Sequence, residues 1–155
     1  MHPLSKLVGL LIAVLGFCGV MWLEGGHPVV LLALPPMLMV LGISLGGIIA
    51  SHGPRRVLRA LAVAFGGRSV AAGEVEELRA LCQRGHRLSY VAGLLQLITG
   101  TMHVFEVLDN PALIGPGLAY AMIGLMHAVL VSELGFASAE RWIAVRAAPP
   151  IPAEA

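Results

Sequence analysis

Four long apolar segments constrain the fold of this 155-residue chain more than any other feature. The hydrocarbon core of a bilayer is about 30 Å thick, and a helix needs about 20 apolar residues to cross it. The four segments, residues 4–23, 29–50, 88–108 and 112–136, each meet this length. A composition of 57% hydrophobic and 12% charged residues is also far from that of a soluble domain. The sequence therefore predicts an all-α polytopic membrane protein with four transmembrane helices.

The remaining residues are too few to build a second independent core. We expect residues 1–50 to form a first transmembrane hairpin and residues 88–136 to form a second. Residues 51–87 are expected to be a cytoplasmic linker with short amphipathic helices. Residues 137–155 are expected to be a cytoplasmic tail, partly disordered at its proline-rich end.

The distribution of basic residues predicts the orientation. Seven of the ten lie in the linker 51–87, Lys6 precedes the first span, and Arg141 and Arg146 follow the last. The two other loops contain no Lys or Arg. Because cytoplasmic loops carry an excess of Lys and Arg, both termini and the linker are predicted to be cytoplasmic. Anionic lipids at the inner face are an expected partner, and nucleic acid is not.

Local signals refine the helices. Pro35-Pro36 should kink the second helix or mark the start of its regular part. Residues 57–65 indicate a short amphipathic helix or an extension of the second helix, ended by Gly66-Gly67, and residues 74–84 a second amphipathic stretch. Cys18 and Cys82 fall in different environments, so neither a disulfide nor a metal pattern is expected.

Small residues recur at steps that let membrane helices approach closely. Eight glycines are the candidates for helix packing: Gly9, Gly16, Gly42, Gly46, Gly93, Gly100, Gly117 and Gly124. These glycines either pack helices within one subunit or leave at least one face for another subunit. We expect at least one of these faces to contact a second copy of the chain.

Polar side chains within the spans are the candidate functional residues, because burying an ionisable group at mid-bilayer costs about 2.5–3.5 kcal/mol. Thr99, His103 and Glu106 share one face of the third span. Such a face can hold water and pass protons, since histidine exchanges protons near neutral pH. The fourth span adds Ser132 and Glu133, together with Tyr120 and His127. The candidates for an ion pathway or a partner-facing surface are Thr99, His103, Glu106, Ser132 and Glu133.

Simpler interpretations remain open for the histidines. His103 can be a neutral residue bonded to a neighbouring helix, with Glu106 extending outward, and His127 can form an interhelical hydrogen bond. Axial haem ligation by the two is disfavoured, because they differ in depth by about 6–9 Å. No nucleophile elbow, phosphate loop or zinc-protease motif occurs. We therefore expect no enzyme activity, no cofactor and no metal site.

The order of these motifs resembles a known family. The first hairpin carries Leu23-Glu24-Gly25-Gly26-His27, then a proline, then a glycine-rich run from Gly42 to Gly47. The second hairpin and the fourth span carry further matches: Gly93, Gly100, His103, Asp109, Pro111, Ala121-Met122-Ile123-Gly124 and Gly135-Phe136. Over about 100 residues, this pattern is similar to the flagellar stator A-subunit, within the MotA/TolQ/ExbB proton-channel family.

The resemblance implies a ring of five subunits around two single-span partner helices. Each partner would carry the aspartate that binds the proton, while the third and fourth spans line the interior. The chain departs from the family in three places. Leu125 stands where the family has a threonine, Tyr90 and Ala139 stand near the expected inner prolines, and the linker lacks the large cytoplasmic domain.

The sequence thus predicts a reduced, stator-like inner-membrane proton-channel subunit. It would form a homo-oligomeric ring around an acidic single-span partner and couple ion flow to mechanical work. One alternative is a non-conducting membrane scaffold of the same fold, which Leu125 favours. A small redox or haem membrane subunit is a third and weaker alternative.

Overall fold

The computed structural model describes residues 3–23, 25, 29, 32–66 and 70–147. The turn residues Glu24 and Gly26, the second glycine of Gly66-Gly67, and the proline-rich tail lie outside this description. The chain divides into two compact units, residues 1–35 and 36–155, and each is described by itself. Every regular element in the described residues is helical, which confirms the predicted all-α class.

The first unit contains helix α1, Pro3–Leu23, which matches the first expected span closely. Gly25 follows it with φ +78°, a left-handed conformation that favours glycine. The Gly25 N–H donates to the Trp22 carbonyl oxygen at 3.1 Å and closes the turn after the helix. Trp22, one residue before the end of the helix, is exposed.

Three helices of the second unit are long and apolar enough to cross a membrane. They are α2 (Leu34–His52), α4 (Val75–Glu106) and the continuous helix Pro111–Val145. This last helix contains α5 (Pro111–Leu130), the π-helical segment η3 (Val131–Ala137) and the first residues of α6 (Ser138–Ala147). These helices are consistent with a membrane protein. A fourth span in α1 and the arrangement as two membrane hairpins stay predictions.

Proline and glycine set the bounds of the shorter helices. Pro35 and Pro36 lie in the first turn of α2, where missing N–H donors cost little, so they start the helix rather than kink it. Gly53, with φ +79°, separates α2 from α3 (Pro54–Gly66). The amphipathic segment is therefore a helix of its own and not an extension of α2.

Helix α4 runs without a break through the position where the sequence suggested a boundary between linker and span. The short turn η2 (Ala72–Glu74) leads directly into it. The second amphipathic stretch, 74–84, and the third apolar segment, 88–108, therefore belong largely to one helix. Gly85 lies inside α4 and is buried. A side chain there would collide with Phe136 and Ile48, so this glycine serves close packing.

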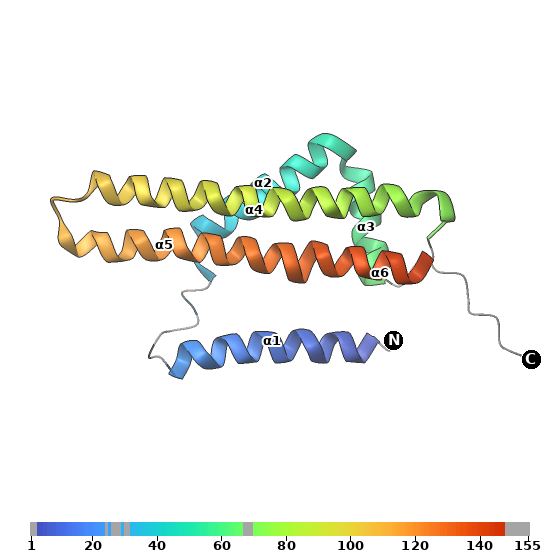
Figure 1. Cartoon of the computed structure of the whole chain (residues 1–155), viewed down its shortest axis with the longest axis horizontal. Coiled ribbons are helices and arrows are strands. Elements are labelled where there is room, and N and C mark those ends of the chain that lie inside the picture. Colours follow the sequence, from blue (N-terminus) through green and yellow to red (C-terminus); the bar gives the residue numbers. More distant parts are fainter. Residues whose placement is uncertain (1–2, 24, 26–28, 30–31, 67–69, 148–155) are drawn as a thin grey trace, which may run out of the picture. The chain divides into compact units, whose positions relative to one another are not determined.

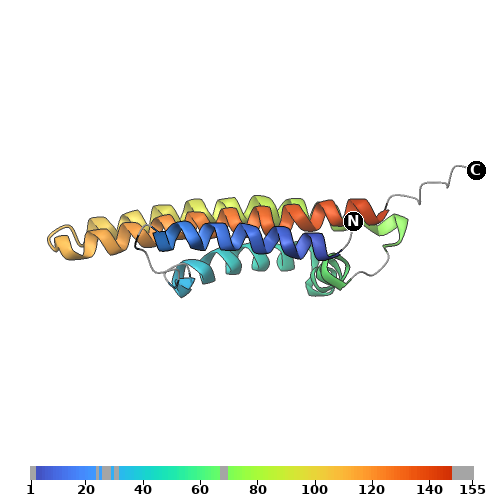
Figure 2. The same cartoon turned by 90° about the horizontal axis from the view of Figure 1, so that it is seen from below.

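Helix α4 packs antiparallel against α5, η3 and α6 along its length (Figures 1 and 2). Residues 107–110 form the turn between α4 and α5. A Cβ on Gly100 would lie 2.5 Å from the Ala121 Cβ, and one on Gly117 would lie 2.9 Å from Val104. Gly93 and Gly124 face Ala128 and Gln96 in the same way. The glycines of the second hairpin thus pack within the chain.

The amphipathic helix α3 is held by a compact apolar core at one end of the α4–α6 pair. The buried residues of this core come from α2, α3, α4 and α6: Ile48, Val57, Ala60, Val63, Leu78, Leu81, Cys82 and Ile143. Two ion pairs flank it, Arg56–Glu77 and Arg59–Glu74, each 2.6 Å long between nitrogen and oxygen. Exposed pairs of this kind contribute little, so apolar burial holds α3 in place.

Candidate functional site

The most prominent polar feature is a row of four side chains on one face of α4. Gln96, Thr99, His103 and Glu106 follow one another at steps of three, four and three residues, which aligns them along the helix. We call this row the polar stripe. Towards the inner end, the same face continues with Ser89 and Ala92, and both are fully buried. This face of α4 is therefore buried on the N-terminal side of Gln96 and exposed on the C-terminal side.

Gln96 begins the stripe and lies close to the middle of the expected span, residues 88–108. Its side chain lies over Gly124 of α5, in the space that a Cβ at Gly124 would fill. Within the described part of the chain, the Gln96 amide makes no hydrogen bond. An amide without a partner is unfavourable in hydrocarbon. Where α4 crosses a membrane, this side chain would require water or another helix beside it.

Thr99 lies next along the stripe and is exposed. Its hydroxyl donates to the Leu95 carbonyl oxygen at 2.9 Å and lies 4.0 Å from the Met39 sulfur of α2. Thr101, on another face, donates to the Leu97 carbonyl at 2.7 Å. Both hydroxyls thus satisfy their donors on the helix backbone and keep acceptor capacity.

His103 and Glu106 form the outer end of the stripe. The His103 Nδ1 lies 3.3 Å from the Glu106 Oε2, and the two side chains are 64% and 70% exposed. The bond to Glu106 within the same helix differs from the expected simpler interpretation, in which His103 bonds a neighbouring helix. If α4 crosses a membrane, a polar pair this open at its end would lie at the membrane interface or against another molecule.

The candidates Ser132 and Glu133 belong to a separate group, which we call the inner polar cluster. It consists of these two residues with His86 and Tyr90 of α4. The Ser132 hydroxyl is buried, 2.6 Å from the His86 Nδ1, and it donates to the His86 carbonyl oxygen at 3.2 Å. The Tyr90 hydroxyl donates to Glu133 at 2.9 Å, and the His86 and Tyr90 rings meet edge to face at 5.2 Å.

The π-helical segment η3 carries half of the inner polar cluster. Its wider turns change which side chains of this helix face α4, and π segments occur often at functional positions. Ser132 and Glu133, which are adjacent in sequence, both reach α4 side chains from η3. The five predicted site residues therefore divide into two groups, the stripe and the cluster.

The histidines do not form a common site. The His103 ring lies 4.0 Å from the place of a Cβ on Gly117, whereas His127 lies ten residues further along α5, about 15 Å away. His127 is buried, and Tyr120 is exposed on α5. Within the described ranges, no three His, Cys, Asp or Glu side chains gather as metal ligands.

Sequence reasoning missed Gln96 and His86. Gln96 was missed because only ionisable groups and hydroxyls were considered inside the membrane. Its spacing from Thr99, His103 and Glu106 was visible and would have identified it. His86 was missed because its partner Ser132 is 46 residues away, and only the register of α4 against η3 brings them together.

The fold and the stripe define the class of this chain. It is an all-helical protein over the described residues, with three helices able to span a membrane and a polar stripe on one of them. Comparison with protein-family models, curated proteins and solved structures finds no match. The particular family is therefore a matter for proposal.

Proposed function

We propose that this chain is a stator-like proton-channel subunit that forms a homo-oligomeric ring around an acidic single-span membrane partner. The observation that carries the proposal is the polar stripe. It combines a mid-span amide without a partner, an exposed threonine hydroxyl and an exposed His103–Glu106 pair on one face. In a ring, this face is covered by a neighbouring subunit, the partner helix or a file of water.

Proton movement requires groups that both donate and accept hydrogen bonds, spaced closely enough for water to connect them. Successive members of the stripe are separated by three or four residues, about 5–6 Å along the helix. One water molecule bridges such a gap. The aspartate of the partner would bind the proton near the middle of the membrane, opposite Gln96. The stripe then supplies the path between that carboxylate and the outer surface.

The proposed orientation places both termini and α3 on the cytoplasmic side of a bacterial inner membrane, with four spans in two hairpins. The basic residues of α3 and of the first turns of α4 support this orientation. The inner helices form one small core and leave no room for a large rotor-binding domain. We therefore propose that ion flow exerts force on the partner helix rather than torque on a flagellar rotor.

The test begins with native mass spectrometry of the chain in mild detergent. The chain is expressed alone and then together with any acidic single-span protein that is encoded beside it. We expect a pentamer that takes up two partner helices. A monomer or dimer that ignores the partner contradicts the ring.

Proton flux tests the role of the stripe in the same complex. The complex is placed in liposomes with an internal pH dye and a potassium diffusion potential. We expect Gln96→Leu and Thr99→Val to lower the flux at least tenfold. Thr101→Val is the matched control, because it removes the same hydroxyl from another face of α4. Equal effects of Thr99→Val and Thr101→Val would contradict a path along the stripe.

A non-conducting scaffold is the second candidate function, and Leu125 favours it. A Cβ on Gly93 would lie 3.4 Å from the Leu125 Cδ1, so this leucine packs into the α4–α5 interface. The Ser132 hydroxyl of the same helix contacts His86, so it does not replace the threonine hydroxyl that is missing at position 125. A ring that binds its partner helix and stays proton-tight would establish the scaffold.

A further inference from the structure

A groove of about 870 Å³ opens on a face of α4 away from the polar stripe, beside the end of α2. Its walls combine basic, polar and apolar side chains: His52, Gln83, Arg84, His86, Arg87, Leu88, Tyr90, Val91 and Leu94, with Ala80 at one end. A volume of this order accepts a ligand of drug-like size, which ordinarily fills about 300–1,000 Å³.

The inner end of the groove is positively charged and uncompensated. Arg84 and Arg87 are exposed and, within the described residues, form no ion pair. Arg56, Arg59 and Arg79 differ, since each lies within 4 Å of a glutamate carboxylate: Glu77, Glu74 and Glu140 respectively. No carboxylate lines the groove. Two guanidinium groups one turn apart, without an acidic neighbour, match the charge of a phosphodiester.

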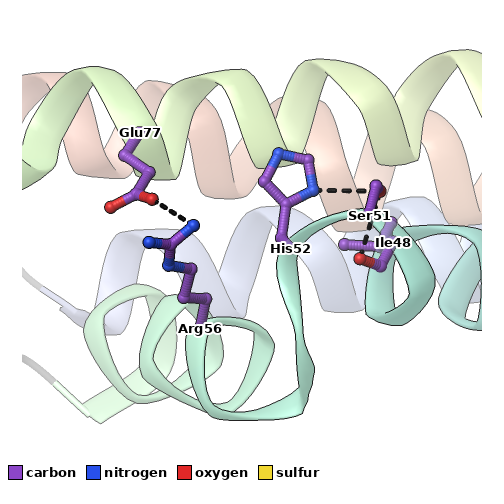
Figure 3. Close-up of polar contacts among 5 residues, drawn as sticks. All are labelled: Ile48, Ser51, His52, Arg56 and Glu77. Atoms are coloured by element: carbon purple, nitrogen blue, oxygen red, sulfur yellow. Dashed lines mark hydrogen bonds and ion pairs between the residues drawn. The ribbon is translucent and has the colours of Figure 1, made fainter.

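His52 adds a third nitrogen-bearing group from the opposite wall. Its ring extends from the junction of α2 and α3 toward α4 (Figure 3). The Nδ1 atom lies 3.1 Å from the Ser51 hydroxyl oxygen, which holds the ring in place. Figure 3 also shows Arg56 reaching Glu77, so this arginine is engaged outside the groove.

The other polar side chains of the groove are already bonded to acidic or hydroxyl partners behind it. Gln83 donates to Glu140 at 2.8 Å, Tyr90 donates to Glu133 at 2.9 Å, and His86 contacts Ser132 at 2.6 Å. Glu140 also lies 3.7 Å from the Arg79 guanidinium, whereas Glu133 forms no ion pair within the described residues. Neither Arg84 nor Arg87 is paired with these carboxylates within the described residues, so both guanidinium groups are available to an anion.

The outer part of the groove is apolar. Leu88, Val91 and Leu94 continue the face of Arg84 and Arg87 at helical spacing, over about 10 Å of helix. Val91 and Leu94 are both exposed. In the proposed orientation, the arginines lie at the inner headgroup level and these side chains lie within the hydrocarbon. The groove therefore changes from cationic to apolar at the depth where an anionic phospholipid changes from headgroup to acyl chain.

We propose that this groove binds one anionic phospholipid of the inner leaflet. The phosphodiester lies between Arg84 and Arg87, and an acyl chain runs along Leu88, Val91 and Leu94. Basic sites beside membrane helices at the cytoplasmic face bind anionic headgroups through the same combination. The inference goes beyond the proposed function but rests on the proposed orientation, which places the arginines at the inner leaflet.

Native mass spectrometry of the detergent-purified chain tests the site. The chain is titrated with phosphatidylglycerol and, separately, with phosphatidylcholine of the same acyl chains. We expect tighter binding of phosphatidylglycerol, and a loss of about 30-fold in the variant Arg84→Gln/Arg87→Gln, given the usual contribution of each arginine near a charged membrane surface. The variant Arg84→Lys/Arg87→Lys keeps the charge and should retain most of the affinity. Circular dichroism establishes that each variant keeps its helices.

The matched control is Arg55→Gln/Arg141→Gln, which removes two exposed arginines that lie outside the groove and form no ion pair within the described residues. This control should leave phosphatidylglycerol affinity nearly unchanged.

An equal loss in both double variants would overturn the proposal in favour of general surface charge. Binding of glycerol phosphate as tight as that of the lipid would also overturn it, because the apolar part of the groove would then contribute nothing. A third outcome would also overturn the proposal: Arg84→Gln/Arg87→Gln dissociates an oligomer and leaves the lipid affinity unchanged. The groove would then be a contact between copies of the chain.

Discussion

Gln96 of α4 fills the space left by the missing Cβ of Gly124 on α5. The glycine thus does more than bring two helices together. It admits a polar side chain into the contact between them, close to the middle of the expected span. Any side chain at position 124 would compete with Gln96 for this space. The packing of α4 on α5 and the polar stripe are therefore coupled at one pair of residues.

The first prediction tests this coupling. In Gly124→Ala, the new Cβ would lie 2.9 Å from the Gln96 Cβ and 3.1 Å from its Cδ, so Gln96 must move. We expect the free energy of unfolding, measured by titration with a denaturing detergent, to fall by about 1–3 kcal/mol. The double variant Gly124→Ala/Gln96→Ala removes the contacts with the Gln96 Cγ and Cδ and leaves only the one with the Cβ, so it should recover part of the loss. Additive losses in the double variant would show that the two residues do not compete.

A second prediction concerns Gly100, where the collision is with backbone. A Cβ there would lie 2.8 Å from the Ala121 Cα and 3.2 Å from its nitrogen, and no rotamer change relieves this. Gly100→Ala should therefore lower the melting temperature in detergent. Gly46→Ala is the control, because a Cβ at Gly46 meets nothing within 4 Å and alanine favours the helix. If Gly46→Ala is as destabilising as Gly100→Ala, α2 packs against a second copy through that glycine.

The helices themselves were largely predictable from the sequence. Apolar length predicted the three helices able to span a membrane and the extent of α1. Of the two alternatives for Pro35-Pro36, a kink or the start of the regular helix, the second is found in α2. The continuity of α4 was not predicted, because an amphipathic stretch followed by an apolar one suggests two environments. Nothing in residues 75–106 breaks a helix, and Gly85 is compatible with one when it packs against Phe136. A change from amphipathic to apolar sequence therefore does not imply a break in the helix.

The candidate site was only partly predictable, for a related reason. The spacing of Thr99, His103 and Glu106 along one helix is local information, and it placed them correctly on one face. The contact of Ser132 with His86 depends on how α5 and η3 align with α4 over more than forty residues. That alignment follows from the glycine contacts and from the π segment, and the helical periodicity of a sequence reports neither.

The third prediction addresses what holds α3 to the rest of the second unit. Ile143 is fully buried in the apolar core, and Cys82 in the same core is 2% exposed. Ile143→Ala should cost about 2–5 kcal/mol and make Cys82 react faster with a maleimide, in a background where Cys18 is serine. Arg56→Gln removes one exposed ion pair and should change the labelling rate little. The reverse order of the two effects would assign the stability of α3 to its ion pairs.

The fourth prediction concerns the inner polar cluster. Ser132→Ala removes the hydroxyl that contacts both the Nδ1 and the carbonyl oxygen of His86. We expect a loss of about 1 kcal/mol in the free energy of unfolding, typical of a buried hydrogen bond. Ser51→Ala is the control, since Ser51 is exposed and donates to the Gly47 carbonyl of its own helix. Equal losses would mean that the contact with His86 adds nothing to stability.

The last prediction separates the conducting subunit from the scaffold. Leu125 follows Gly124 and packs beside Gly93, so Leu125→Thr places a hydroxyl near Gln96 at mid-span. If the stripe conducts protons, the added hydroxyl should raise flux through the ring reconstituted with its partner in liposomes. Leu113→Thr, a similar change on another face of α5, should leave the flux unchanged. A proton-tight ring in both variants would contradict conduction along the stripe. The unpartnered amide of Gln96 would then be explained by contact with another helix, because a side chain at that depth requires a partner whether or not protons pass.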